Sequence, residues 1–158
     1  FDSTVSPIEP LVLSFALTYL DPVYDSFTGS IFGDLSGRRP ANIPDIAMTL
    51  GAVYTQEISD KAKLIASANY LYESAVPIID GFVAAPQTFA RSLTRDQNLI
   101  DASLTLVLGD GLELSVYGRN LLNDQYLTTV FDTVIQAGSI SGYPSLPRTY
   151  GGTVRVRF

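Results

Sequence analysis

Several residue types are missing from this chain of 158 residues. It has no cysteine, no histidine, no tryptophan and a single methionine. Without cysteine and histidine, the chain has no disulfide framework, no zinc site with nitrogen or sulfur ligands, and no catalysis by a cysteine or histidine side chain. The absence of cysteine suits a compartment in which free thiols are a liability, although it does not identify that compartment.

Charge is also scarce, and no segment is continuously apolar. Charged residues make up 16% of the chain, against about 25% in an average soluble domain. The ten basic and sixteen acidic residues give a net charge of −6. Because there is no basic run, nucleic acid is not an expected partner. No stretch reaches the roughly 18 apolar residues that a transmembrane helix needs. The chain starts at Phe1 without a basic and apolar leader, so we expect it to be processed or truncated.

Alternation with a period of two recurs with unusual persistence in six segments. This period of two predicts β-strands with one apolar face, and no helical period extends beyond about two turns. Each segment has about 9–12 residues, longer than the average soluble strand of about 5–6 and similar to the about 9–11 that a tilted strand needs to cross a bilayer. The predicted strands lie near residues 11–21, 46–56, 62–73, 98–108, 112–120 and 148–158.

The connections between these segments alternate in length. Two are short, at 57–60 and 109–111, whereas three are long, at 22–45, 74–97 and 121–147. Loops of more than about 15 residues are uncommon in compact soluble domains. Short turns at one end and long loops at the other are typical of outer-membrane β-barrels.

The parity of the alternation predicts the register of one hairpin. Polar residues occupy odd positions on both strands that flank Gly109–Gly111, so residues of the same face pair only if their numbers add to an even sum. A three-residue turn therefore pairs Leu108 with Leu112 and Thr105 with Ser115. The same register sets Asp101 opposite Arg119, which predicts an ion pair on the polar face.

The apolar face admits two interpretations. It is the core of a soluble sandwich, or it is the lipid-facing surface of a membrane barrel. Two observations favour lipid. All charges inside the strands occupy the other face, namely Lys63, Asp101, Glu113, Arg119, Arg155 and Arg157. Aromatic residues gather near the strand ends, as in the two aromatic girdles of a barrel: Tyr19, Tyr70, Tyr72 and Tyr150 at the long-loop end, and Tyr54 and Phe158 at the short-turn end.

Six strands are too few to close a barrel, because the smallest bacterial single-chain barrels have about eight. We therefore expect a piece of a larger barrel or one subunit of a shared barrel.

Four segments follow one another in an informative order. They are Leu17–Phe27 (LTYLDPVYDSF), Leu35–Ile46 (LSGRRPANIPDI), Val116–Tyr126 (VYGRNLLNDQY) and Pro147–Phe158 (PRTYGGTVRVRF). In this order they resemble the C-terminal portion of a TonB-dependent outer-membrane receptor: a strand leaving the bilayer, a loop before the next strand, the penultimate strand with its Asn-Leu-x-Asn/Asp element, and the last strand.

This resemblance implies an all-β fold, an antiparallel up-and-down meander that forms the end of a transmembrane barrel of about 22 strands. It implies a bacterial outer-membrane location and uptake of a scarce ligand, such as an iron chelate (siderophore), cobalamin or a carbohydrate. The plug domain and the segment that engages TonB are not part of this chain. The implied partners are outer-membrane lipid, the rest of the barrel, the plug, the TonB complex and the barrel-assembly machinery. No catalysis and no cofactor are implied. The signal read by the assembly machinery corresponds to Tyr150, Val154, Val156 and Phe158, although Gly151 and Gly152 depart from its usual spacing.

Candidate ligand-binding residues lie in the predicted long loops. Arg38, Arg39, Arg91 and Arg95 either attract an anionic ligand or are solvated charges balanced by neighbouring aspartates. The aromatic residues Phe82, Phe89, Phe131 and Tyr143 either stack on a ligand or pack the loops together.

Charged residues on the strands form a second group of candidates. Glu113 with Arg155 and Arg157, and Asp101 with Arg119, are interpreted as ion pairs lining the lumen or as contacts to the plug. A passive or structural outer-membrane barrel and a soluble carbohydrate-binding β-sandwich are the alternative functions.

Overall fold

The computed structural model describes residues 1–83, 85–109 and 111–157. These residues form an all-β chain with one short helix, as the alternating pattern predicts. The elements are β1 (Asp2–Ile8), β2 (Leu11–Tyr19), β3 (Ile46–Ser59), β4 (Ala62–Pro77), α1 (Gln87–Ser92), β5 (Thr94–Leu108), β6 (Leu112–Arg119), β7 (Leu127–Asp132), β8 (Ile140–Pro144) and β9 (Thr149–Val156).

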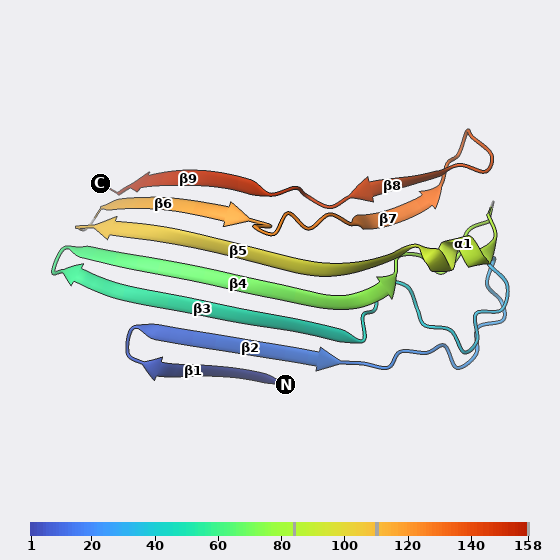
Figure 1. Cartoon of the computed structure of the whole chain (residues 1–158), viewed down its shortest axis with the longest axis horizontal. Coiled ribbons are helices and arrows are strands. Elements are labelled where there is room, and N and C mark those ends of the chain that lie inside the picture. The colour runs from blue at the N-terminus through green and yellow to red at the C-terminus, as the bar shows by residue number, and fades with distance from the viewer. Residues whose placement is uncertain (84, 110, 158) are drawn as a thin grey trace.

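Seven of the strands form one antiparallel meander. Their order in the sheet is β1-β2-β3-β4-β5-β6-β9, so consecutive strands pair with each other, and β7 and β8 form a separate hairpin within the connection from β6 to β9. The short connections between strands gather at one end of the sheet and the long ones at the other (Figure 1). The expected alternation of short turns and long loops is confirmed.

The observed register confirms the prediction from parity. Leu108 pairs with Leu112, and Thr105 pairs with Ser115. The same parity holds across the sheet, so that Leu13, Ala52, Ala68 and Ala102 form one row of apolar side chains across four strands. Each side of the sheet therefore has one character, apolar on one face and largely polar on the other.

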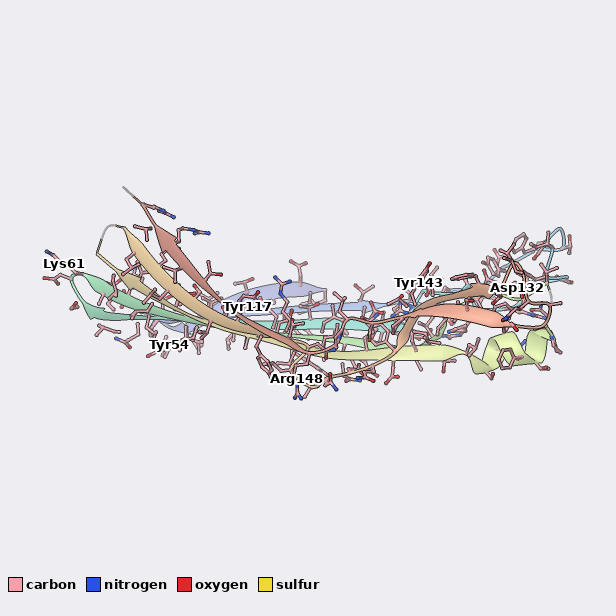
Figure 2. The ribbon with its side chains drawn as sticks, turned by 90° about the horizontal axis from the view of Figure 1, so that it is seen from above. Tyr54, Lys61, Tyr117, Asp132, Tyr143 and Arg148 are labelled. Carbon is pink, nitrogen blue, oxygen red and sulfur yellow. The ribbon has the colours of Figure 1, made fainter. Side chains whose placement is uncertain are left out.

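The sheet is a single curved layer, with side chains projecting from both sides (Figure 2). Tyr54 and Tyr117 extend from opposite sides of it. No second sheet or helix covers the apolar face among the described residues. Leu50, Leu104 and Val156 on this face are 41%, 43% and 52% exposed. The apolar face is thus not the core of a sandwich in the part of the chain that the structure describes.

The buried apolar side chains lie instead at the long-loop end. Ile78, Phe82, Ala90 and Val130 form a cluster, with Ala90 fully buried and Phe82 2% exposed. Leu35 in the first long connection is 1% exposed. The cluster joins residues of the second long connection, α1 and β7, so the long loops pack on one another beyond the ends of the strands.

Four elements differ from the sequence expectation. β1 was not predicted because Asp2, Ser3, Thr4 and Ser6 give it a polar sequence; it forms by pairing with the outer edge of β2. The helix α1 has six residues, too short to show a helical period. The β7–β8 hairpin lies in a connection expected to be irregular, and its strands of six and five residues are short. None of the described helices is long and apolar enough to cross a membrane.

Candidate functional site

Charged side chains meet on the polar face near the short-turn end. Arg155 of β9 and Arg157, which follows the end of β9, both bind Glu113 of β6, with nitrogen–oxygen distances of 3.0 and 3.1 Å. The pairing of Glu113 directly opposite Arg155 explains this contact. Such solvent-accessible ion pairs contribute at most about 1 kcal/mol each, so they add little to the pairing of β6 with β9.

The expected ion pair between Asp101 and Arg119 does not form. Asp101 Oδ1 instead accepts a hydrogen bond from the backbone N–H of Asn120, at 2.9 Å, and the Arg119 guanidinium lies 5.4 Å from the centroid of the Tyr117 ring. Asn120 has φ +49°, in the left-handed region. This turn directs the backbone N–H of Asn120 at Asp101. The backbone donor is already fixed, whereas ordering the flexible Arg119 side chain would cost conformational entropy.

Arg95 is not in a loop, contrary to expectation. Strands β4 and β5 extend beyond their predicted ends after an irregularity between Glu73 and Val76, and Arg95 pairs with Val76. Its guanidinium lies 2.7 Å from Glu73 Oε2, with only 12% of the side chain exposed. Gln97 donates to the same carboxylate oxygen at 2.7 Å. Arg95 is therefore committed to a half-buried polar cluster at the end of the strands.

Tyr126 completes this polar cluster. Its hydroxyl donates to Gln97 Oε1 at 3.0 Å, and the Arg95 guanidinium lies 5.9 Å from its ring centroid. Burial is the main reason that the pKa of Tyr126 is raised; the nearby Arg95 charge lowers the pKa, and the charges of Asp124 and Glu73 raise it. The phenol therefore stays neutral and acts as a hydrogen-bond donor.

Asn120 fixes the chain where β6 enters the third long connection. It is 7% exposed, and its side chain donates to the backbone oxygens of Asp124 and Leu146 and accepts from the Asp124 N–H. Asn123 also has a positive φ, of 55°, and accepts from the Arg148 N–H. Sequence reasoning noted this Asn-Leu-Leu-Asn-Asp segment but missed its role. Asparagine tolerates the left-handed region better than most residues, and this preference was the available signal.

Three of the four candidate arginines line a single cavity of about 250 Å³ at the long-loop end. Arg38 and Arg39 come from the first long connection and Arg91 from the last turn of α1, and Asp80 lies on the same wall. Arg39 binds Asp21 at 2.8 Å and also pairs with Asp45. The Nη1 atom of Arg38 is buried and has no hydrogen-bond partner among the described residues.

Asp80, one of the aspartates expected to balance the loop arginines, connects two loops. Its Oδ1 accepts from the Ala41 N–H at 2.9 Å, and its Oδ2 accepts from the Tyr24 hydroxyl at 3.2 Å. Burial, and then the charge of Asp80 and this hydrogen bond, raise the pKa of Tyr24. No sequence motif marks this contact, because its partners are 39 and 56 residues away.

The four candidate aromatic residues form two pairs. The ring centroids of Phe82 and Phe89 are 6.2 Å apart, and those of Phe131 and Tyr143 are 5.6 Å apart. Phe82 packs in the buried loop cluster, whereas Phe89, Phe131 and Tyr143 are exposed. Phe82 therefore packs the loops, and the other three remain accessible.

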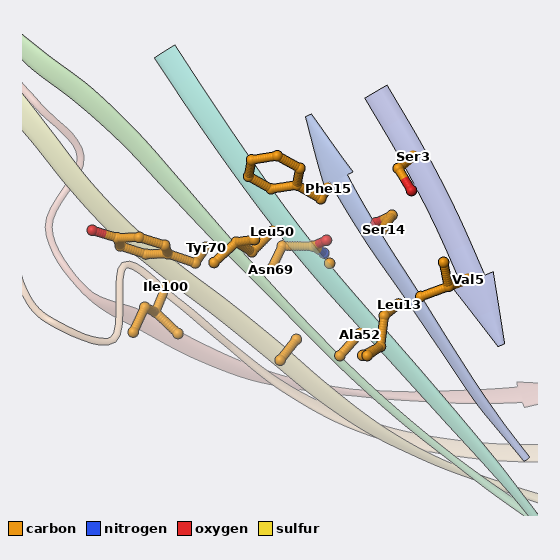
Figure 3. A pocket seen from close by; sticks show the side chains of 12 residues that line it. Ser3, Val5, Leu13, Ser14, Phe15, Leu50, Ala52, Asn69, Tyr70 and Ile100 are labelled. Carbon is orange, nitrogen blue, oxygen red and sulfur yellow. The ribbon is translucent and has the colours of Figure 1, made fainter. Parts of the chain in front are cut away.

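The apolar face is hollowed where small side chains occur. Between β1 and β5, a groove of about 530 Å³ runs past Ala52 and is bounded by Leu13, Leu50 and Tyr70 (Figure 3). On β6 and β9, Tyr150 packs over Gly118 on this face and Tyr117 packs over Gly151 on the other. A Cβ atom at Gly151 would collide with the Tyr117 ring. This contact explains the glycine at 151 in the Gly151–Gly152 pair. Tyr150, Val154 and Val156 are exposed on the apolar face, and Phe158 lies outside the described residues.

One comparison with known proteins gives a match, and it concerns the fold. No protein-family model and no curated protein matches the chain. The chain is similar in structure to BauA, the ferric preacinetobactin receptor from Acinetobacter baumannii, with a TM-score of 0.65 and 20% sequence identity. The match covers 97% of this chain and 20% of the BauA chain, so this chain spans about a fifth of BauA's length. At this identity the likeness shows a related fold.

Proposed function

We propose that this chain is part of the wall of a transmembrane β-barrel in a bacterial outer membrane. The observation that carries the proposal is the uncovered apolar face of the sheet. No charged residue occupies this face over most of its length, from the paired residues Ala62 and Leu108 at the short-turn end to Tyr72 and Asn98 at the long-loop end. In water such a face would be a large exposed apolar patch, of a kind that marks an interaction surface. Against lipid it needs no further cover.

The edges of the sheet support a larger barrel. Among the described strands, β1 and β9 each have one neighbour, so each presents a row of unpaired backbone N–H and C=O groups. Such groups cost several kcal/mol each in the hydrocarbon region. We propose that further strands of a barrel of about 22 pair with both edges. The match of nearly the whole chain to a fifth of BauA agrees with this arrangement.

For the whole protein we propose active uptake of a scarce ligand by a receptor of the TonB-dependent type. The motifs in Leu17–Phe27, Leu35–Ile46, Val116–Tyr126 and Pro147–Phe158 support it, and so does the fold shared with a ferric preacinetobactin receptor. This chain would supply barrel wall and ligand-receiving loops and perform no chemistry. A plug domain, the TonB complex and the barrel-assembly machinery are the partners that this proposal adds.

Site-directed spin labelling tests the membrane part of the proposal, because the chain has no cysteine of its own. Leu104→Cys and Thr105→Cys place labels on adjacent residues of β5 that face opposite sides of the sheet. In the full-length protein in vesicles, we expect the label at 104 to be accessible to oxygen and shielded from a water-soluble relaxation agent. The label at 105 should show the reverse. Equal exposure of both labels to the aqueous agent would contradict lipid contact.

Uptake assays test the transport part. We expect deletion of the gene to abolish growth on one class of scarce nutrient, such as a ferric chelate, and complementation to restore it. Dissipating the proton gradient should stop uptake. Uptake that persists without the gradient would instead support a passive barrel.

A further inference from the structure

The cavity at the long-loop end has a positive charge that its own residues do not balance. We propose that Arg38 and Arg91 bind an oxyanion group, a carboxylate or a phosphate, of a ligand received by the loops. The proposal rests on the proposed function only in assigning the oxyanion to a transported ligand. The site itself is defined by the cavity and by three arginines from two separate segments.

The carboxylates near the cavity are already occupied. Asp21 and Asp45 pair with Arg39, and the two oxygens of Asp80 accept from Ala41 and Tyr24. No ion pair involves Arg38 or Arg91 among residues 1–83, 85–109 and 111–157. The structure therefore leaves two guanidinium groups available to a ligand.

The environment of Arg38 strengthens the argument. Its Nη1 is buried and has no hydrogen-bond partner in the described part of the chain. An unsatisfied buried donor on a charged group costs free energy, so its presence in a native fold calls for a partner. Asp34 does not provide one: its Oδ1 accepts from the Ser36 N–H. Hydrogen bonds from Ser36 are the main reason that its pKa is lowered, and the Arg38 charge contributes least.

The shape and walls of the cavity select the kind of ligand. Leu35, Pro77 and Ile79 give it apolar walls, and charge-assisted hydrogen bonds are stronger beside apolar walls, where the local dielectric constant is lower than in water. Guanidinium groups match carboxylate and phosphate in planar, two-point contacts. At about 250 Å³, the cavity is smaller than the about 300–1,000 Å³ typical of sites for whole drug-sized ligands. It therefore fits one anionic group of a ligand, with the remainder outside.

Binding of simple anions to the full-length protein in detergent provides the test. Inorganic phosphate and acetate are titrated by calorimetry at constant ionic strength into the wild type, Arg38→Gln, Arg91→Gln and the control Arg157→Gln. Arg157 is exposed and lies at the opposite end of the strands. We expect Arg38→Gln and Arg91→Gln to weaken binding by about tenfold or more, as loss of a charge-assisted hydrogen bond would. Arg157→Gln should bind as the wild type does.

Two further measurements make the result decisive. Arg91 is exposed, so Arg91→Gln should fold even if Arg38→Gln does not. Arg38→Lys retains the positive charge, so it separates loss of the charge from loss of the guanidinium group. Loss of phosphate binding in nanodiscs of phosphatidylglycerol, but not of phosphatidylcholine, would assign the site to a lipid headgroup and overturn the assignment to a transported ligand. Unchanged affinity in Arg91→Gln, or no binding of either anion by the wild type, would overturn the site. Neither result depends on uptake, so the proposed transport function stands or fails separately.

Discussion

The sheet and the long connections bury their apolar side chains to very different extents. The strands leave Leu50 and Leu104 about two-fifths exposed, whereas the connections bury Leu35, Phe82 and Ala90 almost completely. Leu35 in the connections is 1% exposed and Leu50 in the strands is 41% exposed, so residue type alone does not explain the difference. If the chain is barrel wall as we propose, the two regions have different surroundings: lipid covers the apolar side chains of the sheet, and water drives those of the connections together.

The two regions are also held together differently. In the sheet, the backbone ladder between antiparallel neighbours and hydroxyl pairs such as Ser67–Ser103, at 2.8 Å, join the strands. In the connections, side chains from α1, β7 and residues 78–82 share a small core. The loop region therefore resembles a minimal water-soluble domain attached to the end of the sheet. Its stability and that of the sheet should respond to different substitutions.

Phe82→Ala should have the largest effect, and it should be confined to the loops. Removing a buried phenylalanine costs about 3–5 kcal/mol, and Phe82 is the one aromatic side chain in the cluster with Ile78, Ala90 and Val130 among the described residues. We expect the long connections of the folded protein to become sensitive to limited proteolysis while the strands stay protected. Phe89→Ala is the matched control, because the Phe89 ring lies beside Phe82 but is 45% exposed. Cleavage within the strands would show that the two regions are not separate.

Arginine substitutions in β3 compare the two faces of the sheet. Leu50 and Val53 are equally exposed, at 41% and 40%, and lie on opposite faces. If the apolar face meets lipid, Leu50→Arg should destabilise the protein by about 2–4 kcal/mol near the middle of the bilayer, and Val53→Arg by much less. Urea unfolding in lipid vesicles measures both. Equal effects would mean that both faces meet the same solvent.

The regions also differ in how far the sequence predicts them. In the strands, a period of two specifies face and register together, which is why the pairing of Thr105 with Ser115 follows from parity alone. The polar β1 carries no such pattern, and it forms by pairing with β2. Its existence depends on a neighbour's free edge rather than on its own residues.

In the connections, contacts between distant residues decide the structure. Arg38 and Arg91 line one cavity because Asp80 joins the first long connection to the second, and no local sequence pattern predicts these contacts. Arg95 was expected among the loop arginines, but β5 continues past it and Glu73 binds it. Residue type thus predicted the candidate arginines, and tertiary structure determined which of them meet.

Asn120→Ala should weaken the junction between the two regions. It removes three side-chain hydrogen bonds, to Asp124 and Leu146, and places alanine at φ +49°. We expect a loss of about 1–3 kcal/mol from the buried groups left unpaired, visible as faster hydrogen exchange of the Asp124 amide. Asn120→Gly separates the two causes, since glycine adopts this φ without strain. If glycine restored the wild-type exchange rate, backbone strain rather than the side chain would account for the effect.

Titration of Tyr24 should give the smallest effect and report on the loop region alone. Its pKa is raised above the usual value of about 10, chiefly by burial and then by Asp80. Because the folded state holds the phenolic proton more tightly, this contribution to stability is present below pH 10 or so and is lost as the pH rises through the raised pKa. Asp80→Asn should lower the pKa of Tyr24 towards its usual value but not fully, since burial remains. Ultraviolet difference titration measures the shift, and Tyr24→Phe identifies the band. A pKa unchanged by Asp80→Asn would mean that Asp80 does not act on Tyr24, and the link between the first and second long connections would then depend on Ala41 and Asn42.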